Sequence, residues 1–194
     1  ALAKRLEKQG VDAVIAEGCE SGGHIGEICT LPLVPQVVDA VKIPVIAAGG
    51  IADGRGLVAA LALGAVAVQM GTRFMCASEC VISPRVKQVI IKAKDRDTVI
   101  TGRSTGHPVR CIANKFTREL EEMEKEGKSV EDVEKFGTGK LKIAMVDGDI
   151  AHGSVMAGQI AGWVSREEPA AAIIEDIIKE AREILSGMQK RVQF

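Results

Sequence analysis

The stretch Ala13-Val-Ile-Ala-Glu-Gly-Cys-Glu-Ser-Gly-Gly-His-Ile-Gly26 places a short apolar run before a glycine-rich loop that holds a single histidine. Because parallel strands covered on both faces are continuously apolar rather than alternating, residues 13–17 predict a buried parallel strand. The glycines after it let the backbone approach a flat ligand closely. His24 is then either a titratable group at the edge of that ligand or a helix-capping histidine in an ordinary loop, and this stretch alone favours neither.

The same pattern returns twice along the chain. Pro44 opens an apolar run that ends at Gly49-Gly50, and residues 65–70 form another run that ends at Gly71-Thr72. Helices are predicted between the runs, one capped by Thr30 and one closed by Gly64. The first of these helices carries an apolar stripe that would pack on a sheet: Leu33, Val34, Val37, Val38 and Val41. Recurrence of strand, loop and helix is the period of a (β/α) barrel or a doubly wound sheet.

The pattern changes after Phe74. Residues 84–94 predict a helix, and residues 98–101 and 109–112 are extended segments able to pair. A charged helix follows, with a narrow apolar stripe of Phe116, Leu120 and Met123, and ends near Gly127. Its charge is better explained by a solvated helix of a small second domain than by a binding tail. We therefore divide the chain into residues 1–84 (βα units), 85–150 (a small inserted domain on the substrate side) and 151–194 (returning helices).

The third segment is predicted to be helical throughout. Ser154 is expected to cap a helix that contains the small residues between 157 and 162, and Ser165-Arg-Glu-Glu-Pro169 reads as a capping box. The last helix is expected to bury Ile173, Ile174, Ile177, Ile178, Ile184 and Leu185. At the other end, the chain begins without methionine and inside a helical pattern, so we expect a strand upstream of it.

Composition limits the functional classes. The formal net charge is −1, with 46% hydrophobic and 26% charged residues, which suits an α/β protein with a substantial core. There is no basic stripe interleaved with aromatic residues, so nucleic acid is not an expected partner. No apolar run approaches the roughly 20 residues that span a bilayer, and no secretory signal is visible; a cytoplasmic protein is expected. The five cysteines form no C-x-x-C pair and are interpreted as reduced thiols that mostly pack, with no metal site.

Two glycine turns on consecutive strands are the strongest chemical feature. In (β/α) barrels the loops after the last two strands commonly bind phosphate through backbone N–H groups, and Thr72 would add a hydroxyl donor. Gln69 at the strand end would reach a ligand ring or ribityl chain. The alternative is that these glycines only make tight turns. Asp53 is interpreted as a helix cap, and Arg73 as a partner of either a phosphate or a carboxylate. His107 and His152 are expected to be turn residues, and hydrolase, zincin and P-loop motifs are absent.

Four motifs in order carry a family resemblance. Glu20-Ser-Gly-Gly-His-Ile-Gly26, Pro44-Val-Ile-Ala-Ala-Gly-Gly-Ile-Ala-Asp-Gly54, Gln69-Met-Gly-Thr-Arg-Phe74 and Gly153-Ser-Val-Met-Ala-Gly-Gln-Ile-Ala-Gly162 resemble the flavin-dependent enoyl-[acyl-carrier-protein] reductase II family, within the nitronate monooxygenase superfamily. The resemblance implies the C-terminal part of an FMN-binding (β/α)8 TIM barrel, strands six to eight, with a small inserted α+β domain. The first five strands would be missing, so we do not expect the chain to hold FMN without them.

The resemblance also implies roles. Gly49, Gly50, Gly71 and Thr72 would hold the FMN phosphate with Gln69 beside them, Gly22 and Gly23 would pass near the ring, and Met156 and Gln159 would cover the substrate. His24 would be catalytic, polarising the thioester carbonyl or delivering a proton during NADH- or NADPH-dependent reduction of trans-2-enoyl-acyl-carrier-protein in fatty acid biosynthesis. A monovalent-cation requirement and a homodimer are left open. The rivals are a nitronate monooxygenase, with His24 as base, and a non-catalytic barrel fragment.

Overall fold

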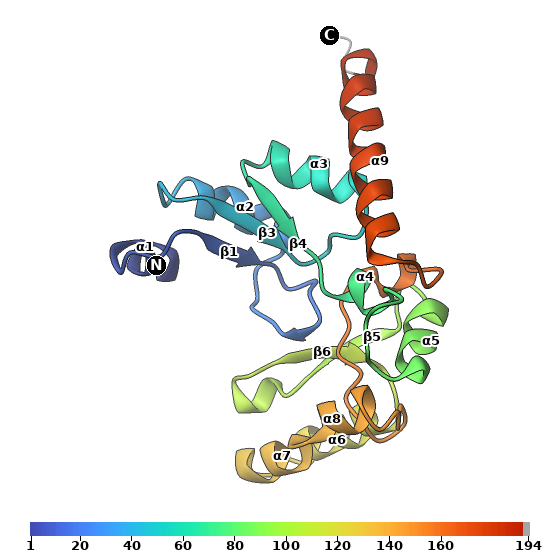
Figure 1. The fold of residues 1–194 in the computed structure, drawn as a ribbon. Helices are drawn as coiled ribbons and strands as arrows, with labels where there is room; N and C mark the ends of the chain where they lie inside the picture. The colour runs from blue at the N-terminus through green and yellow to red at the C-terminus, as the bar shows by residue number, and fades with distance from the viewer. Residues whose placement is uncertain (192–194) are drawn as a thin grey trace.

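Two three-stranded sheets organise the part of the chain that the computed structural model describes, residues 1–191 (Figure 1). The first sheet is parallel and has the order β1-β3-β4, with β1 at Val14–Glu17, β3 at Val45–Ala48 and β4 at Ala67–Gln69. The three predicted apolar runs are therefore confirmed as adjacent parallel strands, but the expectation that residues 13–17 are buried on both faces is wrong, because β1 alternates buried and exposed residues. The carboxyl ends of the three strands, where the glycine turns begin, lie together at one edge of the sheet.

Helices α1 (Leu2–Lys8), α2 (Thr30–Val38) and α3 (Gly54–Ala62) alternate with these strands. Helix α2 packs on β1 and β3, and α3 packs on β4. The predicted apolar stripe of α2 joins one core with the strands: its Val34 is fully buried beside Val14, Val45 and Ala47, and the other four stripe residues pack against this core. The α/β period that was predicted from residues 10–72 is confirmed.

The two helix starts show one correct and one incorrect prediction. Asp53 is the N-cap of α3, and its carboxylate accepts hydrogen bonds from the N–H groups of Arg55 and Gly56. Thr30, in contrast, is not the cap of α2 but its first helical residue, and Cys29 takes the cap position. The backbone N–H and the hydroxyl of Thr30 both donate to the Glu20 carboxylate, which satisfies the helix end from outside.

The second sheet is antiparallel and has the order β2-β6-β5. Strands β5 (Thr98–Thr101) and β6 (Val109–Ile112) pair as predicted, with the short 3-10 helix η1 (Arg103–Thr105) in their connection. Strand β2 is only Gly23–His24 and comes from the glycine loop. Two residues are too few for a periodic signal, so this strand was not predicted. The glycine loop thus links the two sheets.

Five further helices lie between β4 and α9 in the described chain: α4 (Thr72–Met75), α5 (Pro84–Lys92), α6 (Lys115–Lys125), α7 (Val130–Gly137) and α8 (Lys140–Met145). Helices α6, α7 and α8 gather at the end of the molecule opposite the tip of α9 (Figure 1). The predicted stripe of α6 is confirmed, since Phe116 and Leu120 are buried against Val133 of α7. Helices α7 and α8 were not predicted. The domain boundaries at 84 and 150 stay a prediction.

Residues 154–169 do not fold as predicted. The segment from Ser154 to Gly158 is extended beside β6, where the Ile112 N–H donates to the Val155 carbonyl, and only the 3-10 helix η2 (Gln159–Trp163) follows. Nor is there a capping box. Helix α9 (Ala170–Arg191) begins well after Ser165, and the Glu79 carboxylate accepts from the Ala170 N–H instead.

Helix α9 runs along α3 and then projects beyond it (Figure 1). It buries Ile173, Ile177 and Ala181, whereas Ile174, Ile178 and Leu185 are exposed, so only part of the predicted apolar face is covered. The crossing is close because Gly54 has no side chain: a Cβ there would lie 2.5 Å from the Ala181 nitrogen. Among the described residues, no helix combines the length and the hydrophobicity needed to cross a membrane.

Candidate functional site

A cavity of about 320 Å³ opens at the carboxyl ends of the three parallel strands. The strand ends supply one wall, the glycine loop a second, and α8 with the segment after Ser154 a third. The cavity is lined by all the residues predicted to bind a cofactor: Gly22, Gly23, Gly49, Gly50, Gln69, Gly71 and Thr72. The structure therefore brings together seven residues that lie in three separate sequence motifs.

The glycines that line this cavity meet different structural requirements. Gly49 has a φ of +88° and Gly50 a φ of +71°, a left-handed conformation that side chains rarely adopt. A Cβ on Gly22 would lie 2.5 Å from the Ala157 carbonyl carbon, so this glycine permits two backbone segments to meet. Gly71 has neither constraint: its φ is −95°, and a Cβ would meet no atom within 4 Å.

Two hydroxyl groups face this cavity with hydrogen-bonding capacity to spare. Ser21 Oγ is buried and has no hydrogen-bond partner within the part of the chain that the structure describes. Thr72 Oγ1 accepts a hydrogen bond of 2.8 Å from the Gly158 N–H, which leaves its own hydrogen free to be donated. A buried hydroxyl without a partner costs free energy, so Ser21 marks a place where a ligand atom would be stabilised.

The remaining wall is apolar and adaptable. It consists of Met70, Met75, Leu141, Met145, Met156 and Ile160. Methionine side chains are flexible and polarisable, which suits contact with a flat aromatic ring. Of this wall, only Met156 was predicted; Leu141 and Met145 come from α8. Ser21, on another wall, was also not predicted, although it lies within the motif Glu20–Gly26. No sequence signal connects α8 to the strand ends, because their contact is tertiary.

His24 lies in a neighbouring cavity of about 270 Å³, on the exposed face of β2. This second cavity includes His107 and the apolar residues Phe116, Leu120 and Val133, and it shares Leu141 and Met156 with the first. Gln159 lines neither of these two cavities: its side chain is exposed and its backbone N–H donates to the Glu20 carbonyl. The structure thus separates His24 from the glycine cavity by a shared apolar partition.

Arg73 does not line either cavity. It pairs with the carboxylate of Glu168, which also receives Arg166, so the carboxylate interpretation of Arg73 is the one observed. Burial tends to raise the pKa of the Glu168 carboxyl, but the hydrogen bonds and charges of the two arginines outweigh it and hold the pKa below its usual value. This pair fastens the segment just before α9 to helix α4, which follows the third parallel strand.

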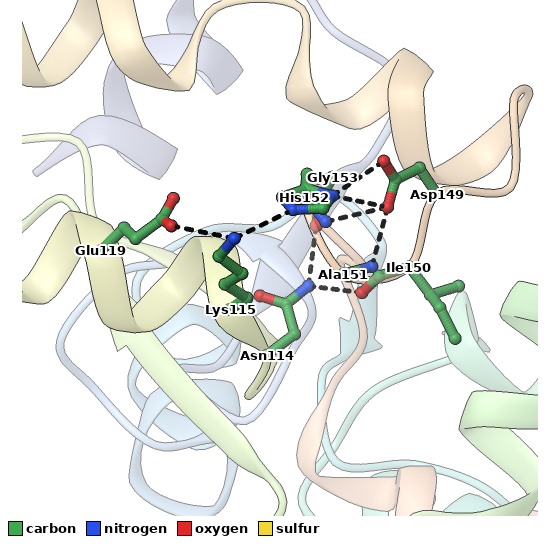
Figure 2. Close-up of polar contacts among 8 residues, drawn as sticks. All are labelled: Asn114, Lys115, Glu119, Asp149, Ile150, Ala151, His152 and Gly153. Carbon is green, nitrogen blue, oxygen red and sulfur yellow. Dashed lines mark hydrogen bonds and ion pairs between the residues drawn. The ribbon is translucent and has the colours of Figure 1, made fainter.

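His152 belongs to a surface network, as predicted for a turn residue. Figure 2 shows its ring between the Asp149 carboxylate, at 2.9 Å from Nδ1, and Lys115 Nζ, at 3.3 Å from Nε2. The hydrogen bonds that His152 donates lower the pKa of Asp149. This network lies outside both cavities, so it supports the turn rather than the site.

With this geometry established, the chain was compared with known proteins. The sequence model of the nitronate monooxygenase family matches residues 1–180. The chain belongs to the nitronate monooxygenase family. The resemblance stated from the four motifs is thereby confirmed at the level of the family.

Proteins similar to this chain are named as a probable nitronate monooxygenase, as FabK and as a nitroalkane oxidase. A probable nitronate monooxygenase of Staphylococcus saprophyticus is 40% identical over 191 residues, which is 93% of this chain and 54% of the relative. FabK from Thermotoga maritima is 51% identical with a TM-score of 0.94, over 98% of this chain and 61% of that one. A nitroalkane oxidase from Streptomyces ansochromogenes is 34% identical with a TM-score of 0.80, over 95% and 56%. The chain spans about half the length of the curated relatives it matches.

Proposed function

We propose that this chain forms the phosphate side and the proton-donor side of an FMN-dependent enoyl-[acyl-carrier-protein] reductase that uses NADH or NADPH. The observation that carries the proposal is the cavity in which all seven predicted cofactor residues meet. The choice among reactions is supported by identity: 51% with FabK, the reductase type to which the motifs pointed, against 40% with the probable nitronate monooxygenase of Staphylococcus saprophyticus and 34% with the nitroalkane oxidase.

The residues present fit FMN. The turns at Gly49-Gly50 and Gly71-Thr72 offer backbone N–H groups and one free hydroxyl hydrogen to a phosphate. Ser21 offers a second hydroxyl that lacks a partner, and Gln69 offers an amide for a ring or ribityl edge. The volume of about 320 Å³ lies at the lower end of the roughly 300–1,000 Å³ of ligand pockets, which agrees with further wall residues lying outside this chain.

When bound, FMN would supply the hydride transfer from nicotinamide to the enoyl thioester. The role proposed for His24 is to donate an imidazole N–H to the thioester carbonyl or to deliver the proton to the α-carbon. Its position in the second cavity supports a role at the substrate end, because the glycine turns that would hold the phosphate line the first cavity. The apolar residues of the second cavity, Phe116, Leu120 and Val133, suit an acyl chain.

A second candidate is a nitronate monooxygenase, favoured by the names of the curated relatives. In that reaction His24 would remove the α-proton of a nitroalkane. The same residue and the same two cavities would serve this reaction. A third candidate, a non-catalytic barrel fragment, is favoured by the short span of this chain relative to its relatives.

One set of assays tests all three. The polypeptide that carries this sequence is purified, its flavin absorbance is recorded, and NADH consumption is followed with a crotonyl thioester and with nitroethane. We expect flavin absorbance and thioester-dependent NADH consumption, and His24→Ala should lower turnover while leaving FMN bound. Turnover with nitroethane alone would establish the monooxygenase, and absence of flavin would favour the fragment. Unchanged turnover in the His24→Ala variant would remove His24 from the mechanism.

A further inference from the structure

Two cysteines meet at the base of the glycine loop. Cys19 and Cys29 are ten residues apart in sequence, yet their Sγ atoms are 3.2 Å apart. The backbone fixes this approach, because the Cys19 N–H donates to the Ile28 carbonyl at 2.9 Å and Cys29 caps α2. A disulfide bond is about 2.05 Å long, so a movement of little more than 1 Å would join the two sulfurs.

A metal ion is the competing use of this pair. Glu20 is the only further metal-binding group beside the sulfurs within the described residues. Both of its carboxylate oxygens already accept hydrogen bonds from Thr30, and these bonds hold the start of α2. A structural zinc site needs four ligands, with two thiolates about 3.8 Å apart. The short sulfur–sulfur distance and the committed carboxylate favour redox chemistry over metal binding.

We propose that Cys19 and Cys29 are a thiol–disulfide redox site that closes residues 19–29 into a covalent loop. The oxidant is a low-molecular-weight disulfide, written RSSR. The thiolate of Cys29, the exposed member, attacks RSSR, forms a mixed disulfide and releases RS⁻. Cys19 then loses its proton to solvent and attacks Cys29 Sγ, which forms the internal bond and releases the second RS⁻; each RS⁻ takes up one proton. The two thiols lose two electrons and two protons, and RSSR becomes two RSH.

The environment of the pair sets the order of attack. Burial and the hydrogen bond with Cys29 raise the pKa of the Cys19 thiol to about 11, so Cys19 keeps its proton at neutral pH. Cys29 is exposed and is reached first by an oxidant in solution. The backbone of Cys19 is also fixed in position, because the Arg110 guanidinium donates two hydrogen bonds to its carbonyl oxygen, at 2.9 and 3.1 Å.

The closed loop contains residues of both cavities, namely Ser21, Gly22 and Gly23 of the first and His24 of the second. Oxidation would therefore join the ends of the segment that connects the two sheets. This proposal concerns the thiols themselves, and its test does not depend on whether the cavity binds flavin.

The test is a thiol count on the intact chain. The protein is incubated with oxidised glutathione, denatured, alkylated and weighed, with and without dithiothreitol. Alkylated thiols should fall from five to three, so that the oxidised protein is lighter by the mass that two alkylations add and by about 2 Da more for the two lost hydrogens. Dithiothreitol should reverse this difference, and a cross-linked peptide should join residues 19 and 29. Cys29→Ser should abolish this change, and Cys19→Ser should leave a glutathione adduct on Cys29. The matched control is Cys80→Ser, which removes a half-buried thiol elsewhere and should leave the cross-link intact.

Two results would overturn the proposal. One is a stable glutathione adduct on Cys29 of the unsubstituted protein, without an internal bond. The other is protection of both thiols by added Zn²⁺ that a chelator reverses and a reductant does not, which would identify the pair as a metal site.

Discussion

Gly71 separates a requirement of binding from a requirement of folding. It lines the first cavity, its backbone suits any residue, and a Cβ would enter open space. Gly71→Ala, made in the polypeptide that carries this sequence, should leave the free energy of unfolding within about 0.5 kcal/mol of the parent and weaken FMN binding about tenfold, because the methyl group occupies ligand space. Denaturant titration and flavin fluorescence measure the two quantities.

Gly22→Ala is the matched control, since its Cβ would meet backbone atoms at 2.5 Å and should destabilise the protein itself. Equal destabilisation by both alanines would show that Gly71 is a folding residue after all.

For Ser21 we expect a substitution to stabilise the ligand-free protein. Its hydroxyl is buried without a partner among the described residues, so Ser21→Ala should raise the free energy of unfolding of the ligand-free protein by about 1 kcal/mol. The same substitution should weaken FMN binding, because the ligand loses a hydroxyl. Thermal unfolding with and without FMN gives both values. A destabilised ligand-free protein would indicate that the hydroxyl has a partner of its own.

At the scale of single residues, the sequence predicted those cavity residues that belong to its repeated pattern of an apolar strand followed by glycine. Five of the seven predicted cavity residues are glycines that follow apolar strands, and the other two, Gln69 and Thr72, lie on either side of the last glycine. Ser21, Leu141 and Met145 gave no such signal: each is an ordinary residue type that becomes a wall only through tertiary contact.

Among elements, α9 is fastened by the ion pair of Arg73 and Glu168, whose side chains are only 13% and 11% exposed. Glu168→Gln should lower the free energy of unfolding by about 3 kcal/mol, because it leaves the buried Arg73 guanidinium without its counter-charge. The pKa of Glu168 is lowered in the folded state, so this contribution is complete above the usual carboxyl pKa and is lost as the pH falls through the folded value.

Urea unfolding between pH 7 and pH 3 checks this prediction. The parent and Glu168→Gln should differ at neutral pH and converge in acid, and curves that stay parallel would contradict the assignment.

Asn114 is the second element-scale case. Its carbonyl caps α6 by accepting from the Thr117 N–H, and its amide donates to the carbonyls of Ile150 and Gly153, both at 2.8 Å (Figure 2). Asn114→Ala should lower the free energy of unfolding by about 2 kcal/mol. About half of this loss comes from the helix cap and half from the two hydrogen bonds that tie the amide to the turn. Ser129→Ala, which removes a cap without a tie, should cost about 1 kcal/mol. Similar losses in chemical denaturation would show that the tie contributes little.

The element scale also explains the incorrect helix at residues 154–162. Small residues suit a helix, and they equally suit an extended segment pressed against another backbone. Here the second use prevails: a Cβ on Gly158 would lie 2.7 Å from the Glu20 carbonyl, and one on Gly162 would lie 3.0 Å from the Asp95 nitrogen. A local pattern does not contain this information, whereas the five predicted strands (β1, β3, β4, β5 and β6) and α5 were placed to within two residues.

For the molecule as a whole, the parallel sheet has one face packed by α2 and α3, whereas parallel sheets are ordinarily covered on both. Ile15 on edge strand β1 is 51% exposed and Val66 beside β4 is 62% exposed. We expect the chain on its own to self-associate, and Ile15→Lys to reduce the association by placing a charge on the edge strand. Sedimentation velocity over a concentration series measures this. A constant monomer mass at all concentrations would contradict it.

The family was predicted from four motifs in sequence order, and the match of the family model over residues 1–180 confirms that prediction. The position of the three strands within a complete barrel stays a prediction, because their mutual register says nothing about neighbours on either side. Nor did any sequence feature show that the glycine loop joins the second sheet through β2.

The partition between the two cavities has a thermodynamic consequence. Leu141 and Met156 belong to both walls, so a displacement that enlarges one cavity narrows the other. Methionine adapts readily to such displacement. Ligands of the two cavities would then alter each other's affinity by the same factor, since coupling free energies are reciprocal. A wider flat ring in the first cavity would therefore leave less room for an acyl chain in the second, because Leu141 and Met156 line both cavities.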